Sequence, residues 1–107
     1  MSAQRTLWDF DFVSGQLVAP PMSRNKWLAL NALVEAGTNG LTDFELEARV
    51  GVKQTSIGKR RGDLVKAGLV EATGLFRPSD TGTASGVWCS TPAGYERWLV
   101  ERGRRTG

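Results

Sequence analysis

Basic side chains gather in one short stretch of this 107-residue chain, between residues 49 and 66. Its lysines and arginines are Arg49, Lys53, Lys59, Arg60, Arg61 and Lys66. Asp63 is the one acidic residue among them, so the stretch carries a local charge of +5 in a chain whose net charge is +3. Ammonium and guanidinium groups concentrated in this way suit the binding of a phosphate backbone. The pattern therefore favours a nucleic acid as the binding partner.

Residue types for catalysis or metal binding are scarce. The chain has no histidine and a single cysteine, Cys89. Histidine-activated nucleophiles and the usual zinc-ligand sets are therefore missing, and one thiol cannot close an internal disulfide. No glycine-rich phosphate loop of the P-loop type is present either. We predict a protein that is not an enzyme and that has no metal, no cofactor and no evident small-molecule ligand.

Length and hydropathy predict one folded domain without a membrane segment. The chain has 107 residues, of which 40% are hydrophobic, and this composition is typical of a single globular domain. No run approaches the roughly 18 apolar residues of a transmembrane helix, and the first residues show no apolar segment of signal-peptide type. We therefore expect a cytoplasmic protein, of a bacterium or a phage-infected host, that does not bind membranes.

Three helices are predicted in the middle of the chain. The first spans residues 23–36, with Ser23 as an N-cap whose hydroxyl can accept a backbone N–H. The second spans residues 42–50 and begins with a capping box. Gly51 supplies a turn position that tolerates positive φ, and the third helix spans residues 54–67. Two short helices joined by a tight glycine turn form a helix-turn-helix unit.

A hairpin and a last helix follow the helix-turn-helix unit. Residues 69–72 suit one strand and residues 86–91 the return strand, with a loop of turn-forming residues between them. Thr91 is a plausible N-cap and Pro92 suits the first position of a final helix. The apolar side of this helix carries Tyr95, Trp98 and Leu99.

The N-terminal part differs in pattern from the rest. Residues 8–12 alternate aromatic and acidic side chains, which is the period-2 pattern of a short, half-buried strand. We therefore divide the chain into an N-terminal aromatic arm over residues 1–22 and a folded domain over residues 23–102. Residues 103–107 form a flexible basic tail.

A family resemblance rests on segments between residue 41 and about residue 94, half the chain. They are Leu41-Thr42-Asp43-Phe44-Glu45-Leu46, Gly51-Val52, Thr55-Ser56-Ile57-Gly58-Lys59-Arg60-Arg61, Leu64-Val65-Lys66-Ala67-Gly68-Leu69-Val70, and Val87-Trp88 through Thr91-Pro92-Ala93-Gly94. Together they resemble the winged helix-turn-helix superfamily, in its MarR-like and phage or actinobacterial variants. The resemblance implies an α+β fold, mostly α, with a three-helix winged helix-turn-helix core and a β-hairpin wing. This chain adds an N-terminal aromatic arm and a C-terminal helix to that core.

The resemblance also implies a function, namely sequence-specific binding of double-stranded DNA by a transcriptional regulator or a phage-type DNA-binding factor. The helix over residues 54–67 would enter the major groove, which admits one helix. Hydroxyl, amide and cationic groups on its outer face would contact bases and phosphates. The predicted DNA-binding residues are Lys53, Gln54, Thr55, Ser56, Lys59, Arg60, Lys66 and Arg77.

Two features depart from the family pattern. Arg61 lies on the core side of its helix, where most such domains carry an aliphatic residue. We expect its stem to pack and its head to reach solvent or to pair with a carboxylate, Glu45 and Glu47 being the candidates. The wing tip, residues 79–83, carries an acid and no base. Whether the wing contacts DNA is therefore left open, with Arg77 as its one basic candidate.

The sequence is also compatible with one alternative function and with one further partner. The chain could be a winged-helix adaptor for protein–protein interactions, using the arm aromatics Trp8, Phe10 and Phe12. Two copies could also form a homodimer, through the arm or through the last helix around Tyr95 and Leu99. A dimer would read two half-sites about one helical turn apart.

Overall fold

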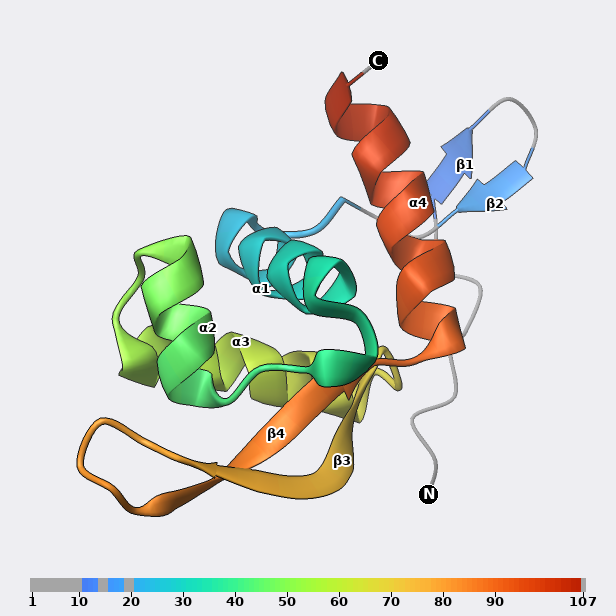
Figure 1. Cartoon of the computed structure of the whole chain (residues 1–107). Helices are drawn as coiled ribbons and strands as arrows, with labels where there is room; N and C mark the ends of the chain where they lie inside the picture. Colours follow the sequence, from blue (N-terminus) through green and yellow to red (C-terminus); the bar gives the residue numbers. More distant parts are fainter. Residues whose placement is uncertain (1–10, 14–15, 19–20, 107) are drawn as a thin grey trace.

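The computed structural model describes residues 11–13, 16–18 and 21–106. In chain order its elements are β1 (Asp11–Val13), β2 (Gln16–Val18), α1 (Arg24–Ala36), the 3-10 turn η2 (Gly37–Asn39), α2 (Asp43–Val50), α3 (Gln54–Lys66), β3 (Val70–Pro78), β4 (Ala84–Ser90) and α4 (Pro92–Thr106). Helix α1 lies across α2 and α3, the β3–β4 hairpin projects below them, and α4 stands at the opposite end (Figure 1).

Local capping signals set the helix boundaries where they were predicted. In α2, the Glu45 N–H donates to Thr42 Oγ1 at 3.1 Å and the Thr42 N–H donates to Glu45 Oε1 at 2.9 Å, which confirms the capping box. Gly51 ends α2 in the left-handed region, with φ of 74°. Ser23 is the N-cap of α1, but its hydroxyl makes no capping hydrogen bond, so that detail of the prediction was wrong.

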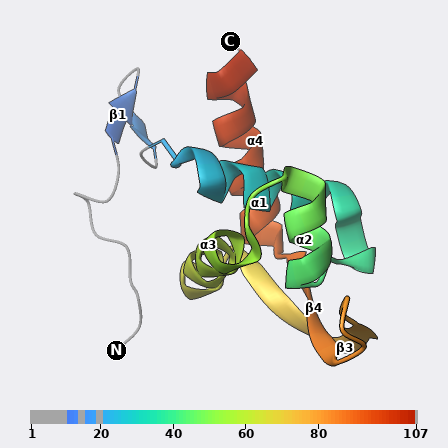
Figure 2. The ribbon, with the colours of Figure 1, turned by 90° about the vertical axis from the view of Figure 1, so that its left-hand side faces the viewer.

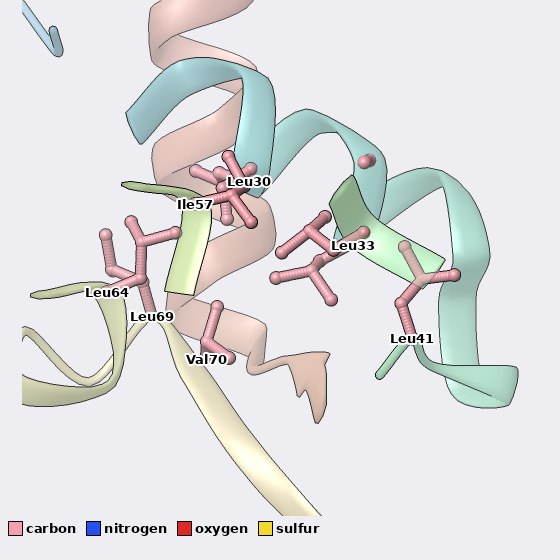
Figure 3. Close-up of a cluster of buried hydrophobic side chains, with 10 residues drawn as sticks. Leu30, Leu33, Leu41, Ile57, Leu64, Leu69 and Val70 are labelled. Carbon is pink, nitrogen blue, oxygen red and sulfur yellow. The ribbon is translucent and has the colours of Figure 1, made fainter. Parts of the chain in front are cut away.

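The core is formed by apolar side chains from α1, α2, α3 and the residues around the start of β3 (Figure 3). Leu30, Leu33, Ile57 and Leu64 have no exposed surface. Burying side chains of this size is worth about 1.5–3 kcal/mol each. Helix α3 therefore packs one side against α1 and α2, and no other described helix covers its remaining side (Figure 2).

The wing is longer than the sequence pattern predicted. Strands β3 and β4 pair antiparallel from Val70↔Ser90 to Pro78↔Ala84, with a register shift between Ala72 and Phe76. Leu41, just before α2, adds a bridge to β4, because its N–H and carbonyl both bond to the backbone of Trp88 at 2.9 Å. The hairpin is therefore fixed at its base to the helical body.

Helix α4 begins at Pro92, as predicted, and the Gly94 N–H donates to Thr91 Oγ1 at 3.0 Å. A Cβ on Gly94 would overlap the carbonyl oxygen of Leu69, so only glycine fits this close contact between α4 and the start of the hairpin. The helix continues to Thr106 without interruption. The segment predicted as a flexible tail, residues 103–107, is helical up to residue 106, and Arg104 and Arg105 pair there with Glu101, while its flexibility stays a prediction.

The arm contains a short antiparallel pair, β1 and β2, in which Phe12 lies opposite Leu17. This pair agrees only in part with the strand predicted over residues 8–12, because Trp8 and Phe10 lie outside the described residues. Among the described helices, none is long and apolar enough to cross a membrane.

Candidate nucleic-acid interface

The open side of α3 carries the polar and basic residues that the sequence predicted there. Ser56, Lys59 and Lys66 are exposed, Arg60 is half-buried, and Lys53 is exposed at the N-cap of the helix. The side chains of Gln54 and Thr55 lie outside the part of the structure that is described. Because Ile57 and Leu64 are buried against α1, this polar side faces away from the core.

The cationic side chains of α3 differ in whether they form ion pairs within the fold. Arg60 Nη2 lies 3.2 Å from Asp63 Oδ2, but both side chains are about one-third exposed, and such surface pairs contribute little. Lys53, Lys59 and Lys66 form no ion pair with any residue that the structure describes. The open side of α3 therefore presents lysines whose charge is not neutralised within the described chain.

Arg61 has the structural role that was predicted, but with a different partner. Its Nε and Nη2 donate to the two carboxylate oxygens of Asp43 at 3.0 and 2.7 Å, and its guanidinium lies 4.1 Å from the centroid of the Trp88 ring. The prediction of Glu45 or Glu47 as the partner was wrong. Asp43, in the first turn of α2, lies next to the middle of α3, and Arg61 thereby joins α2, α3 and β4.

Arg77 connects the wing to the helical body. Its Nη2 and Nε donate to Glu45 at 2.7 and 3.2 Å, and its guanidinium also donates to the carbonyl oxygens of Asn39 and Gly40 at 3.1 and 2.9 Å. The hydrogen bond from Arg77 lowers the pKa of Glu45 below its ordinary value. The sequence predicted Glu45 in the capping box and as a candidate partner of Arg61, whereas in the structure it forms the capping box and pairs with Arg77. The DNA contact that the sequence predicted for Arg77 is not tested by this geometry, but because the fold already uses its donors, we expect a structural role instead.

Replacing Arg77 by glutamine tests this structural role. We expect no change in the salt dependence of duplex binding, whereas Lys59→Gln, with the same loss of charge, reduces the slope of log K against log salt by about 0.9. The backbone amides of β3 and β4 should exchange hydrogen faster in Arg77→Gln, because the wing loses the Arg77–Glu45 link to α2. Equal losses of slope in both variants would place Arg77 on the phosphate backbone.

The wing itself exposes apolar rather than basic groups. Leu75 and Phe76 are 62% and 68% exposed, and the tip around Asp80 is closed by a hydrogen bond from the Ser79 N–H to the Thr83 carbonyl at 2.8 Å. Of the described part of the hairpin, Arg77 is the only base, and it is paired with Glu45. The positive charge of this side of the molecule therefore lies on α3 and not on the wing.

The apolar side of α4 is only partly used by the core. Trp98 packs against the core, and its indole N–H donates to Asn31 Oδ1 at 2.8 Å. Tyr95, which stacks on Trp98, is 48% exposed, and Leu99 is 44% exposed. Homodimer formation through this helix stays a prediction, and these two exposed side chains are the ones that were predicted to form the contact.

Little in the described chain supports chemistry of another kind. Burial raises the pKa of the Cys89 thiol, and the charge of Glu71 adds to the effect, so the reactive thiolate is disfavoured. The described residues hold no group of three or more histidine, cysteine or acidic side chains that could bind a metal ion.

The architecture of this chain is defined by three helices, by a paired hairpin that follows α3, and by the bridge from Leu41 to β4. It has the winged helix-turn-helix fold.

Solved structures with the same fold include bacterial transcription regulators. The PcaV transcriptional regulator from Streptomyces coelicolor is 20% identical, with a TM-score of 0.64, and the match covers 78% of this chain and 57% of PcaV. MarR from E. coli, without ligand, is 20% identical, with a TM-score of 0.62 over 77% and 56% of the two chains. A mutant of MepR from S. aureus bound to an oligodeoxyribonucleotide is 12% identical, with a TM-score of 0.64 over 79% and 59%.

This chain thus spans less than three-fifths of the length of each of these three regulators. No protein-family model matches the sequence, and no curated protein matches it either. The likeness at 12–20% identity concerns the fold.

Proposed function

We propose that this chain is a sequence-specific double-stranded DNA-binding protein, a transcriptional regulator or phage-type factor, that inserts α3 into the major groove. One observation carries the proposal. The open side of α3 presents Lys53, Lys59 and Lys66 without ion-pair partners among the described residues, while Arg61 and Arg77 are held in bidentate pairs within the fold. The charge available for phosphates is thus concentrated on one helix.

The dimensions and the chemistry of α3 support this role. Its 13 residues give a rod of about 20 Å, and the major groove is about 12 Å wide, which admits one helix. The exposed hydroxyl of Ser56 can donate to or accept from base edges and phosphates. Because Arg61 joins α3 to Asp43 of α2, the helix is presented in a fixed orientation.

The solved neighbours add support at the level of the protein class. PcaV is a transcriptional regulator, and the MepR mutant was solved bound to an oligodeoxyribonucleotide. The adaptor alternative depends on Trp8, Phe10 and Phe12, whose side chains lie outside the described part of the chain, so no observation favours it over DNA binding.

Selection on randomised duplexes, followed by fluorescence anisotropy across a salt series, tests the proposal. Four phosphate contacts, by the three lysines and Arg60 of this surface, predict a slope of log K against log salt of about −3.6, at about −0.9 for each contact. The selection should also yield a preferred sequence, and its symmetry reports whether two copies bind. Association that salt does not weaken, or no enrichment over random duplexes, contradicts the proposal.

A further inference from the structure

We propose that the DNA interface extends beyond the helix-turn-helix unit to the start of α1, where Arg24 joins Lys59 and Arg60 in binding the phosphate backbone. This inference rests on the proposed duplex binding. It adds a second element, the start of α1, to the contact surface.

The supporting feature is a cleft of about 420 Å³ between α1 and α3. It is lined by Ser23, Arg24 and Asn25 from the start of α1 and by Ser56, Lys59 and Arg60 from α3. Three of these side chains are cations, the other three are hydroxyls or an amide, and none is acidic. Such a lining provides charge-assisted and neutral hydrogen-bond donors, which is the chemistry that binds a phosphate group.

The basic groups around the cleft are available for a ligand. Arg24 and Lys59 are both exposed, and neither forms an ion pair with another residue in the described ranges. The hydroxyl of Ser23 is not used to cap α1. Arg60 has only its partly exposed pair with Asp63, which is weak enough to be exchanged for a phosphate.

The two sides of the cleft are held at a fixed separation. Helices α1 and α3 pack against each other through Leu30, Ile57 and Leu64, which are fully buried. A ligand in the cleft therefore meets groups that are already in position, so little ordering entropy is lost on binding.

The position of the cleft favours a DNA phosphate over a free anion. Ser56 and Lys59 line the cleft and also belong to the exposed side of α3 that would enter the groove. A phosphate in the cleft would thus belong to a backbone strand that borders this groove. The wing tip, with Asp80 and no base, offers no such contact at the other edge.

Arg24→Gln, compared with Lys26→Gln, tests the inference on the full chain. Both changes remove one charge from α1, but Lys26 lines a different cleft, with Asp63 and Leu64. We expect Arg24→Gln to reduce the slope of log K against log salt by about 0.9, which corresponds to a loss of roughly 5- to 10-fold in affinity at 0.1 M salt. The loss should be equal on selected and scrambled duplexes, because phosphates carry no sequence information. Lys26→Gln should retain the parental slope.

Three results would overturn the inference while leaving duplex binding intact. They are a parental slope for Arg24→Gln, an equal loss in Lys26→Gln, and a loss confined to the selected sequence. Titration with inorganic phosphate forms a further arm, and an effect of Arg24→Gln on phosphate but not on duplex would make the cleft a free-anion site. If the parental chain binds no duplex, the proposed function fails and this inference fails with it. Thermal unfolding of Arg24→Gln should match that of the parent, since Arg24 is exposed and unpaired among the described residues.

Discussion

Replacing Lys59 and Arg60 together by glutamate lowers duplex affinity by about 100-fold or more at 0.1 M salt, measured by fluorescence anisotropy. The double change removes two cations and places two anions in the middle of the exposed side of α3. Losing two phosphate contacts reduces the salt slope by about 1.8, which alone accounts for roughly 60-fold, and repulsion between the new carboxylates and the phosphates adds to the loss.

Folding is not expected to account for this loss. The pair of Arg60 with Asp63 lies at the surface, where such pairs contribute about 0–1 kcal/mol, and Lys59 has no ion pair among the described residues. Far-ultraviolet circular dichroism and thermal unfolding should therefore stay close to those of the parent.

Arg102→Glu provides the control for charge. It changes the net charge by the same amount as either single reversal, and it lies in the second half of α4, which stands on the far side of α1 from α3 (Figure 1). We expect Arg102→Glu to reduce affinity far less than Lys59→Glu alone. If the double variant binds within a few-fold of the parent, the assignment of α3 to the groove is wrong.

Glu101→Gln is expected to lower the free energy of unfolding by about 3 kcal/mol, measured by urea denaturation. The Glu101 carboxylate is buried, and it accepts hydrogen bonds from Arg97, Arg104 and Arg105 at 3.0, 3.3 and 3.2 Å. The Met22 N–H, just before α1, donates to it at 3.3 Å. A neutral amide of the same shape leaves the guanidinium groups without their counter-charge, and their partial exposure keeps the expected loss at the lower end for such pairs.

The same carboxylate makes stability depend on pH. Burial raises the pKa of Glu101, but the hydrogen bonds from Arg97 and Met22 and the charges of Arg97 and Arg105 outweigh burial, so its pKa lies below the ordinary value. Glu45 has a lowered pKa as well, through its hydrogen bond from Arg77. A carboxyl whose pKa is lower in the folded state stabilises the fold above its unfolded pKa of about 4.3, and this stabilisation is lost as pH falls through the folded pKa.

Acid unfolding of Glu101→Gln should therefore depend less on pH below about pH 4.5 than that of the parent. Glu96→Gln is the matched control, since Glu96 is exposed on the same helix and its loss should change stability by no more than about 0.5 kcal/mol. Two results would show that the Glu101 carboxylate contributes nothing to the fold. They are equal stability of the two variants, and a dependence of stability on pH below about pH 4.5 that is unchanged in Glu101→Gln.

Local sequence signals determined the helix-turn-helix unit and the order of the elements. The capping box at Thr42, the turn at Gly51 and the Thr91-Pro92 pair each act within a few residues, so their effect on the backbone can be predicted without knowing the fold. The sides of α3 could be assigned in the same way, because helical periodicity separates Ile57 and Leu64 from the polar residues.

Only the tertiary structure decided which charges remain available for a ligand. Arg61 pairs with Asp43 across 18 positions and Arg77 with Glu45 across 32, and Glu101 pairs both within α4 and with the chain before α1. Arg24, which gave no signal in the sequence, reaches the α3 surface because α1 packs there. Which charges meet depends on which surfaces the helices bring together, and the hydrophobic burial that packs the helices is not directional. The positions of the charges in the sequence therefore did not identify their partners.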